Sequence, residues 1–239
     1  MKRLRKPRFL FIYPIAIALG LLGHTTEWGF RLGIGILLLA VLLRLWANGH
    51  VGHRKVNWTP PGSAGGKIGC LITAGPYAYV RNPLYFGSLL IIAGFCVMLG
   101  SIWLGLVGLA CFLFIYRTKI LEEEHTLRHE WGSAFERYVA SVPRLWPTWR
   151  RNPHREGQWS WQGLRASKEL KTMGWVSVGI ILCYFREEII QEGESLLGED
   201  VLKHTIWFVV LGLIVLIDAA YELVKRSRRR SAPVAVPHL

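Results

Sequence analysis

The stretch Gly75–Leu90, GPYAYVRNPLYFGSLL, is where the chain passes from a polar loop into an apolar run. Its first two residues, a Gly-Pro pair, are typical of a turn. Pro83 disfavours helical geometry at Asn82 and is itself well suited to the first turn of a helix. The pattern therefore predicts a helix that begins near Pro83, with Arg81, Asn82 and Tyr85 gathered at its entrance.

Arg81 is the unusual residue of this stretch, because a cation at the mouth of an apolar helix is costly unless it has a partner. The run of three carboxylates at positions 122–124 is the candidate partner. An alternative stays open, since arginine and tyrosine beside a membrane helix also serve as a topology anchor with an aromatic belt. The stretch thus predicts either a site at a membrane surface or an anchor.

The composition indicates an integral membrane protein. Of the 239 residues, 51% are hydrophobic, and the apolar residues fall into blocks that are each somewhat shorter than the ~20 residues of a straight span. We expect an all-α, polytopic integral membrane bundle of about six transmembrane helices, with a cofactor pocket on the cytoplasmic side. The six blocks are Phe9–Gly23, Leu32–Trp46, Leu84–Leu99, Ile102–Tyr116, Met173–Phe185 and Thr205–Tyr221.

The distribution of basic residues predicts the orientation. Segments 1–8, 47–83, 117–171 and 225–230 together hold 25 of the 29 lysines and arginines, and such residues accumulate on the cytoplasmic side. We therefore expect both termini in the cytoplasm, in the cell or inner membrane if the protein is bacterial. The net charge of +13 then points to anionic lipid headgroups as partners and not to nucleic acid.

A second motif supports the interpretation of residues 75–90 as part of a functional site. It reads EEHTLRHEWG over residues 123–132, followed by Phe135 and Tyr138. With RNPLYFG at residues 81–87, it resembles the isoprenylcysteine carboxyl methyltransferase family and its phospholipid methyltransferase relatives. Those enzymes are similar in carrying Arg-His-Pro-x-Tyr-x-Gly, an apolar hairpin and Glu-Glu-x-x-Leu. The resemblance covers roughly residues 43–147.

The resemblance implies S-adenosylmethionine as cofactor. No Gly-x-Gly-x-x-Gly motif stands at a strand-to-helix junction, so we expect no soluble dinucleotide-binding fold. In the family the cofactor is held by the loop before the helix, the helix entrance and the glutamate pair, and the resemblance implies the same elements here. Asn82 stands where the family has histidine, which keeps a hydrogen-bonding group but removes one that titrates near neutrality. The residues implied are Gly69, Cys70, Leu71, Ile72, Tyr77, Asn82, Pro83, Leu84, Tyr85, Glu123 and Glu124.

The resemblance also implies an acceptor that enters from the bilayer, most simply the carboxylate of an isoprenylcysteine-like substrate. Arg81, Arg117 and Lys119 are the candidate cations for such a carboxylate. Lys119 stands where the family has a substrate-orienting arginine, and lysine gives a point charge without the bidentate fork. Lys119 and Glu123 also lie four residues apart, on one face of a helix.

Other functions remain open at this stage. A lipid amine headgroup is an alternative methyl acceptor, an NADPH-dependent reductase of the sterol reductase type is an alternative enzyme, and a scaffold without activity is a third. The spacing of His125 and His129 would suit zinc, but no third ligand follows, and we expect no metal. We expect a methyltransferase core over residues 1–150 with four helices. We also expect residues 151–239 to form an extension with an interfacial segment and two further spans.

Overall fold

The computed structural model describes residues 23–51, 71–167, 169–186 and 209. These residues form helices joined by turns and loops, and they contain no β-strand, so the expected all-α class is confirmed for them. The chain divides into two compact units, residues 1–170 and residues 171–239. The candidate site lies entirely in the first unit.

Helix α2, Glu27–Val51, is the helix in the described part of the chain that is long and apolar enough to cross a membrane. Thr26 precedes it, and its hydroxyl accepts a hydrogen bond from Gly29 N at 3.1 Å, which satisfies one free amide of the first turn. Large apolar side chains such as Leu38, Leu39 and Leu42 are exposed along the helix. A contiguous apolar surface of this kind is typical of contact with lipid.

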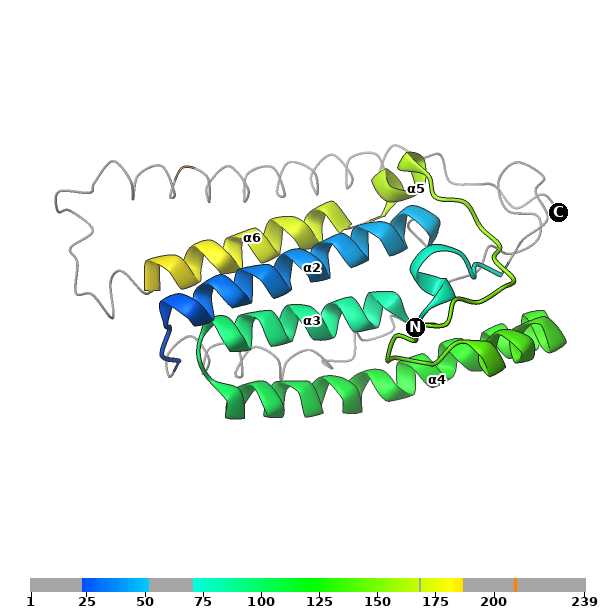
Figure 1. Ribbon diagram of the computed structural model, residues 1–239, viewed down its shortest axis with the longest axis horizontal. Coiled ribbons are helices and arrows are strands. Elements are labelled where there is room, and N and C mark those ends of the chain that lie inside the picture. The colour runs from blue at the N-terminus through cyan, green and yellow to red at the C-terminus, as the bar shows by residue number, and fades with distance from the viewer. Residues whose placement is uncertain (1–22, 52–70, 168, 187–208, 210–239) are drawn as a thin grey trace, which may run out of the picture. The chain divides into compact units, whose positions relative to one another are not determined.

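Helices α3, Pro83–Met98, and α4, Ile102–Ser141, form the expected hairpin, and its tip falls at Gly100 as the sequence predicts. Figure 1 shows α3 lying between α2 and α4. Helix α4 extends well past its apolar block at residues 102–116. Its regular geometry is interrupted at Gly132, where φ is 47° and ψ is −121°.

Small residues let these helices approach closely, although not always the pair that the sequence indicates. A Cβ on Gly94 would lie 2.7 Å from Leu37 Cγ, so Gly94 packs against α2 and not against the other arm of its own hairpin. Gly105 of α4 faces Cys96 of α3, as expected for the hairpin. Glycine therefore serves both interfaces of α3.

A segment without regular structure, residues 142–160, follows α4 and is called the strap here. It passes beside the loop before α3 (Figure 1). The hydrogen bonds show that it runs antiparallel to residues 73–81. The strap thereby fixes the loop that precedes α3. The bonds are Arg81 N to Pro143 O, Thr148 N to Tyr79 O, Asn152 N to Ala78 O, and Thr73 N and Ala74 N to Glu156 O, all at 2.9–3.1 Å.

Two helices follow the strap. Helix α5, Trp161–Ala166, is capped by the Ser160 hydroxyl, which accepts from Gly163 N at 3.0 Å, and α6 spans Glu169–Arg186. Because the boundary between the compact units falls after Leu170, the strap and α5 lie with the first unit. The extension expected over residues 151–239 stays a prediction.

The expected count of six membrane helices remains a prediction. The blocks at 9–23 and 205–221 lie almost wholly outside the described residues, and α3 is apolar but shorter than a straight span. The same holds for the cytoplasmic position of both termini.

Candidate active site at the entrance of helix α3

The loop before α3 is built by a short 3-10 helix, η2, Gly75–Ala78. Gly75 has φ of +62°, and the ring of His50 at the end of α2 occupies the space that a Cβ would need there. Both the positive φ and the crowding favour glycine at this position. The Gly-Pro turn that the sequence indicates is therefore also a contact with α2.

Tyr77 lies inside this loop and is buried together with Tyr138 of α4. The Tyr138 hydroxyl donates to Tyr77 O at 2.8 Å, which ties the loop to the far part of α4. Burial raises the pKa of the Tyr77 hydroxyl well above its ordinary value, with smaller contributions from Tyr138 and Glu123. Tyr77 is thus a neutral, anchored side chain whose hydroxyl pKa is also raised by the negative charge of Glu123.

Glu123 is the carboxylate at the centre of the candidate site. Tyr85, in the first turn of α3, donates its hydroxyl to Glu123 Oε1 at 3.0 Å, and Lys119 Nζ lies 3.9 Å from the same oxygen. Burial raises the pKa of Glu123, while the Tyr85 hydrogen bond and the Lys119 charge lower it. The lysine is half exposed, so Glu123 is a partly buried carboxylate whose ion pair with Lys119 is long and open to solvent.

Tyr85, which contacts this carboxylate, is the first of three aromatic rings in successive contact. Tyr85 meets Tyr116 edge to face, with ring centroids 5.1 Å apart, and Phe112 stacks on Tyr116 at 4.1 Å. Such ring faces carry partial negative charge and attract cations. The carboxylate and the rings together form an environment suited to a positively charged ligand.

Glu124, the next residue, has a different environment. It is only 3% exposed, and Arg144 of the strap donates to both of its oxygens, at 3.0 and 2.7 Å. Arg81 Nη1 lies 3.4 Å from Glu124 Oε1, so the partner expected for Arg81 among the three glutamates is found. Two guanidinium groups therefore share one buried carboxylate, and the cluster carries a net positive charge.

Arg81 itself is buried and retains hydrogen-bonding capacity. Its Nε and Nη1 atoms have no hydrogen-bond acceptor among the described residues, although Nη1 keeps its ionic contact with Glu124. Burial lowers the pKa of Arg81, partly offset by Glu124. The Asn82 side chain donates to Arg144 O at 2.9 Å and does not cap α3.

The remaining candidate residues are distributed as follows. Leu71 and Ile72 are buried in two hydrophobic clusters, so their backbones, and not their side chains, are the groups suited to a ligand. Pro83 is buried, and Leu84 packs against the cluster that contains Tyr77. The described ion pairs join Lys119 to Glu122 and Glu123, and none of them involves Arg117. Gly69 and Cys70 lie outside the described residues.

No group of three or more histidine, cysteine, aspartate or glutamate side chains with metal-binding geometry occurs within the described part of the chain. His129 and Glu130 approach each other at 3.8 Å.

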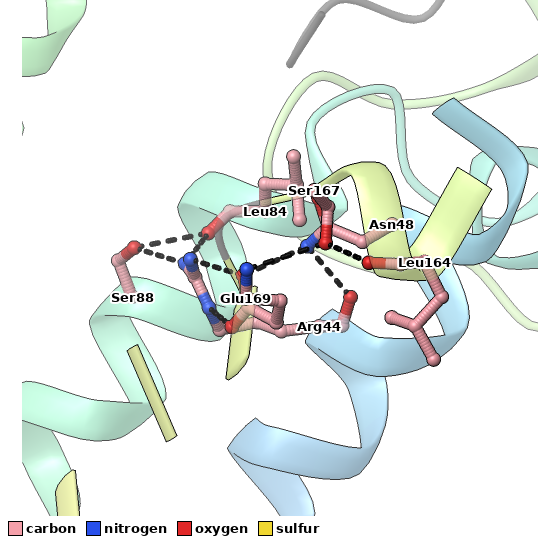
Figure 2. A network of polar contacts seen from close by, with 7 residues as sticks. All are labelled: Arg44, Asn48, Leu84, Ser88, Leu164, Ser167 and Glu169. Carbon is pink, nitrogen blue, oxygen red and sulfur yellow. Dashed lines mark hydrogen bonds and ion pairs between the residues drawn. The ribbon is translucent and has the colours of Figure 1, made fainter. Parts of the chain in front are cut away.

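Sequence reasoning misses a buried ion pair next to this site. Arg44 of α2 contacts Glu169 at the start of α6, and Asn48 donates to the same carboxylate (Figure 2). An available signal was the cation at position 44 within the apolar run LLRLW, because a charge inside an apolar helix requires a partner. The strap arginine Arg144 is missed as well, because nothing local marks it as a partner of Glu124.

Comparison with known proteins gives the class. Residues 28–132 match the model of a family described as phospholipid methyltransferase. This segment includes Arg81, Tyr85, Lys119 and Glu123, so most of the candidate site lies inside the matched region. Over this core the chain is similar to that family of membrane methyltransferases, which in turn resemble the isoprenylcysteine carboxyl methyltransferases. The resemblance inferred from the two motifs is thereby confirmed, and family and apolar helix together indicate a membrane protein.

Two curated bacterial proteins are similar to this chain. The cobalt-zinc-cadmium resistance protein CzcN of Cupriavidus metallidurans is 28% identical over 137 residues, which is 57% of this chain and 51% of that protein. The nickel-cobalt-cadmium resistance protein NccN of Alcaligenes xylosoxydans is 29% identical over 109 residues, 46% of this chain and 45% of that protein. The chain thus spans about half the length of these relatives. No solved structure matches it.

Proposed function

We propose that this protein is an S-adenosylmethionine-dependent methyltransferase that acts on a lipophilic acceptor resident in the membrane. The family supports the reaction class. The observation that carries the cofactor assignment is the partly buried Glu123 carboxylate, which is hydrogen-bonded to Tyr85, a ring that packs in turn on Tyr116. An anionic, aromatic-lined group suits a cationic ligand better than a phosphate-bearing one.

Bound S-adenosylmethionine would supply a methyl group carried by a positively charged sulfur. Glu123 would hold the ammonium or ribose hydroxyl groups of this ligand, and the ring of Tyr85 would face its positive charge. Tyr77, which is buried in a hydrophobic cluster, would anchor the loop beside the ligand. The backbone of residues 69–72 and the α3 entrance at residues 82–84 would complete the contacts. The protein's task is then to position the reactants and exclude water, because a carboxylate acceptor needs little acid or base assistance.

Glu124 is assigned a supporting role in this proposal. Its carboxylate is already bound by Arg144 and lies beside Arg81, so binding a ligand there would require breaking a bidentate contact. Arg81 remains a candidate for an acceptor anion, because its buried Nε has no acceptor of its own among the described residues.

Lys119 is the proposed contact for the acceptor carboxylate. It lies one turn before Glu123, and its ammonium is 3.9–4.0 Å from two carboxylates, too far for a tight hydrogen bond. Its charge is therefore free to meet an anion at the membrane surface. Carboxyl methylation of an isoprenylcysteine-like substrate is the activity that this arrangement supports best.

A lipid amine is the second candidate acceptor. Glu122 and Glu123 outnumber Lys119 locally, which would favour a cationic headgroup, and the family description itself refers to phospholipids. A nicotinamide-dependent reductase is less well supported, because these carboxylates would repel the phosphates of NADPH.

The first test is ligand binding to detergent-purified protein by calorimetry. Titration with S-adenosylmethionine should give saturable binding, and titration with NADPH should give none. Binding of NADPH alone would replace the methyltransferase proposal with the reductase.

The second test separates the two acceptors. Lys119→Met keeps most of the apolar stem and removes the charge, so turnover of a prenylated carboxylate should fall roughly ten- to a thousandfold at unchanged cofactor affinity. Methylation of an amine lipid should instead hold or improve. Arg137→Met, which removes an exposed cation from the same helix, is the matched control. Unchanged turnover on both acceptors would eliminate Lys119 as a substrate contact.

A further inference from the structure

A buried polar network joins α2, α3 and the start of α6, and Figure 2 shows its members around the Arg44 side chain. Arg44 Nε donates to Glu169 Oε1 at 2.6 Å, and Nη2 donates to Oε2 at 2.9 Å. Asn48 Nδ2 donates to Glu169 Oε2 at 2.8 Å and to Arg44 O at 2.9 Å. The exposed fractions are 6% for Arg44, 0% for Asn48 and 1% for Glu169, so the network is closed to solvent.

The remaining nitrogen of Arg44 reaches α3. Nη1 donates to Leu84 O at 2.9 Å and to Ser88 Oγ at 2.7 Å, in the first turns of that helix. The absence of a side chain at Gly87 makes this reach possible, because a Cβ there would lie 2.5 Å from Arg44 Cγ. The guanidinium group thus uses all three nitrogens to hold the entrance of α3 against α2 and Glu169.

The contact falls directly beside the candidate cofactor group. Leu84, whose carbonyl Arg44 holds, is the neighbour in sequence of Tyr85, whose hydroxyl is bonded to Glu123. Leu84 also packs against the hydrophobic cluster of Ala47, Val51, Ile72 and Tyr77. A shift of the first turn of α3 would therefore move Tyr85 relative to both Glu123 and the loop at residue 77.

Stability alone does not account for such a network. Two charges that are removed from water lose hydration free energy, and the attraction between them barely compensates for that loss. Proteins in which well-packed apolar residues of similar volume replace such a pair are often as stable or more stable. A fork that holds three groups at fixed angles does, however, define one geometry, which a flexible apolar contact does not.

We propose that Arg44 and Glu169 are positioning residues for the methyltransferase site. Their ion pair fixes the first turn of α3 so that Tyr85 meets Glu123 in the geometry that binds the cofactor. This inference rests on the proposed function. It assigns Arg44 no contact with cofactor or acceptor, and it predicts an effect on cofactor binding that is separable from an effect on folding.

The test compares Arg44→Met with the double variant Arg44→Met/Glu169→Leu, by thermal unfolding and by calorimetric titration with S-adenosylmethionine. The single variant leaves a buried carboxylate without its cation and should melt well below wild type. The double variant removes both charges and should recover most of the melting temperature. Its cofactor dissociation constant should nevertheless be at least about tenfold larger, since a tenfold change corresponds to about 1.4 kcal/mol, the order of one misplaced hydrogen bond to a charged group.

Arg44→Lys provides a second measurement if the double variant does not accumulate. It keeps the charge but loses the fork, so it should also bind the cofactor more weakly, with a smaller loss of melting temperature. Arg31→Met is the matched control, because Arg31 forms an exposed ion pair with Glu27 on the same helix, and it should change neither quantity.

Two results would overturn the inference. Cofactor affinity equal to wild type in a folded double variant, or in folded Arg44→Lys, would make the network purely structural. Failure of wild-type protein to bind S-adenosylmethionine would remove the proposed function and this inference with it. The wild-type titration distinguishes the two cases.

Discussion

Glu123 and Glu124 are adjacent in sequence, and the structure predicts opposite consequences for the same substitution at the two positions. Glu124→Gln removes the charge that Arg144 binds at 2.7 and 3.0 Å and that Arg81 faces at 3.4 Å. Breaking a buried ion pair on one side costs about 3–5 kcal/mol. Because one of the two arginines is itself buried, we expect a loss within that range.

Glu123→Gln should cost little stability. Burial already disfavours the charged form of Glu123, as the direction of its pKa shift indicates, and glutamine can still accept the Tyr85 hydrogen bond. We expect a change within about 1 kcal/mol, the contribution of one ordinary hydrogen bond. The substitution deletes the charge proposed to face the cofactor, so binding of S-adenosylmethionine should be lost or severely weakened.

Thermal unfolding and calorimetric titration of both variants in the same detergent would check this contrast. At about 2–4 °C per kcal/mol for a chain of this size, Glu124→Gln should lower the melting temperature by roughly 6–20 °C, and Glu123→Gln by no more than about 4 °C. Where folded, Glu124→Gln should keep more cofactor affinity than Glu123→Gln. The reverse ranking in both assays would refute the division of roles between the two glutamates.

Three further predictions follow from single features of the structure. The pKa of Glu123 is raised above its ordinary value of 4.5, so the native state binds more protons than the unfolded state just above that pH. As pH increases through the folded pKa, stability should therefore fall and affinity for a cationic cofactor should rise. Glu123→Gln should abolish both trends, as measured by melting and by cofactor titration at different pH values. Gly132→Ala places a side chain on a residue with φ of 47°, and the new Cβ would meet no atom within 4 Å. The free energy of unfolding should therefore fall by about 1–3 kcal/mol through backbone strain alone, seen as a lower melting temperature with unchanged cofactor binding. Thr73→Val removes two hydrogen bonds of 2.9 Å to the strap, with His154 O and Glu156 N, and should increase proteolysis within residues 152–157. An unchanged digestion pattern would show that the backbone hydrogen bonds hold the strap without the Thr73 side chain.

Much of the local architecture could be predicted from residues close together in the chain. The Pro83 start of α3, the turn at Gly100 and the contact of Lys119 with Glu123 all depend on preferences that act within a few positions. The same is true of the motif pair, because both halves of the candidate site are local patterns. The sequence could also name the glutamate run as the partner of Arg81, since an unpaired buried arginine is too costly.

The tertiary structure decided which surface each of these residues faces. Neighbouring helix positions differ by about 100° in direction, so Glu123 turns to Tyr85 while Glu124 turns to Arg144, and only the packing of α3 and the strap distinguishes them. Arg44 and Glu169 are 125 positions apart. No local pattern encodes such a contact, because it depends on how α2, α3 and the strap pack together, and that packing minimises the energy of the whole unit and not of any one segment.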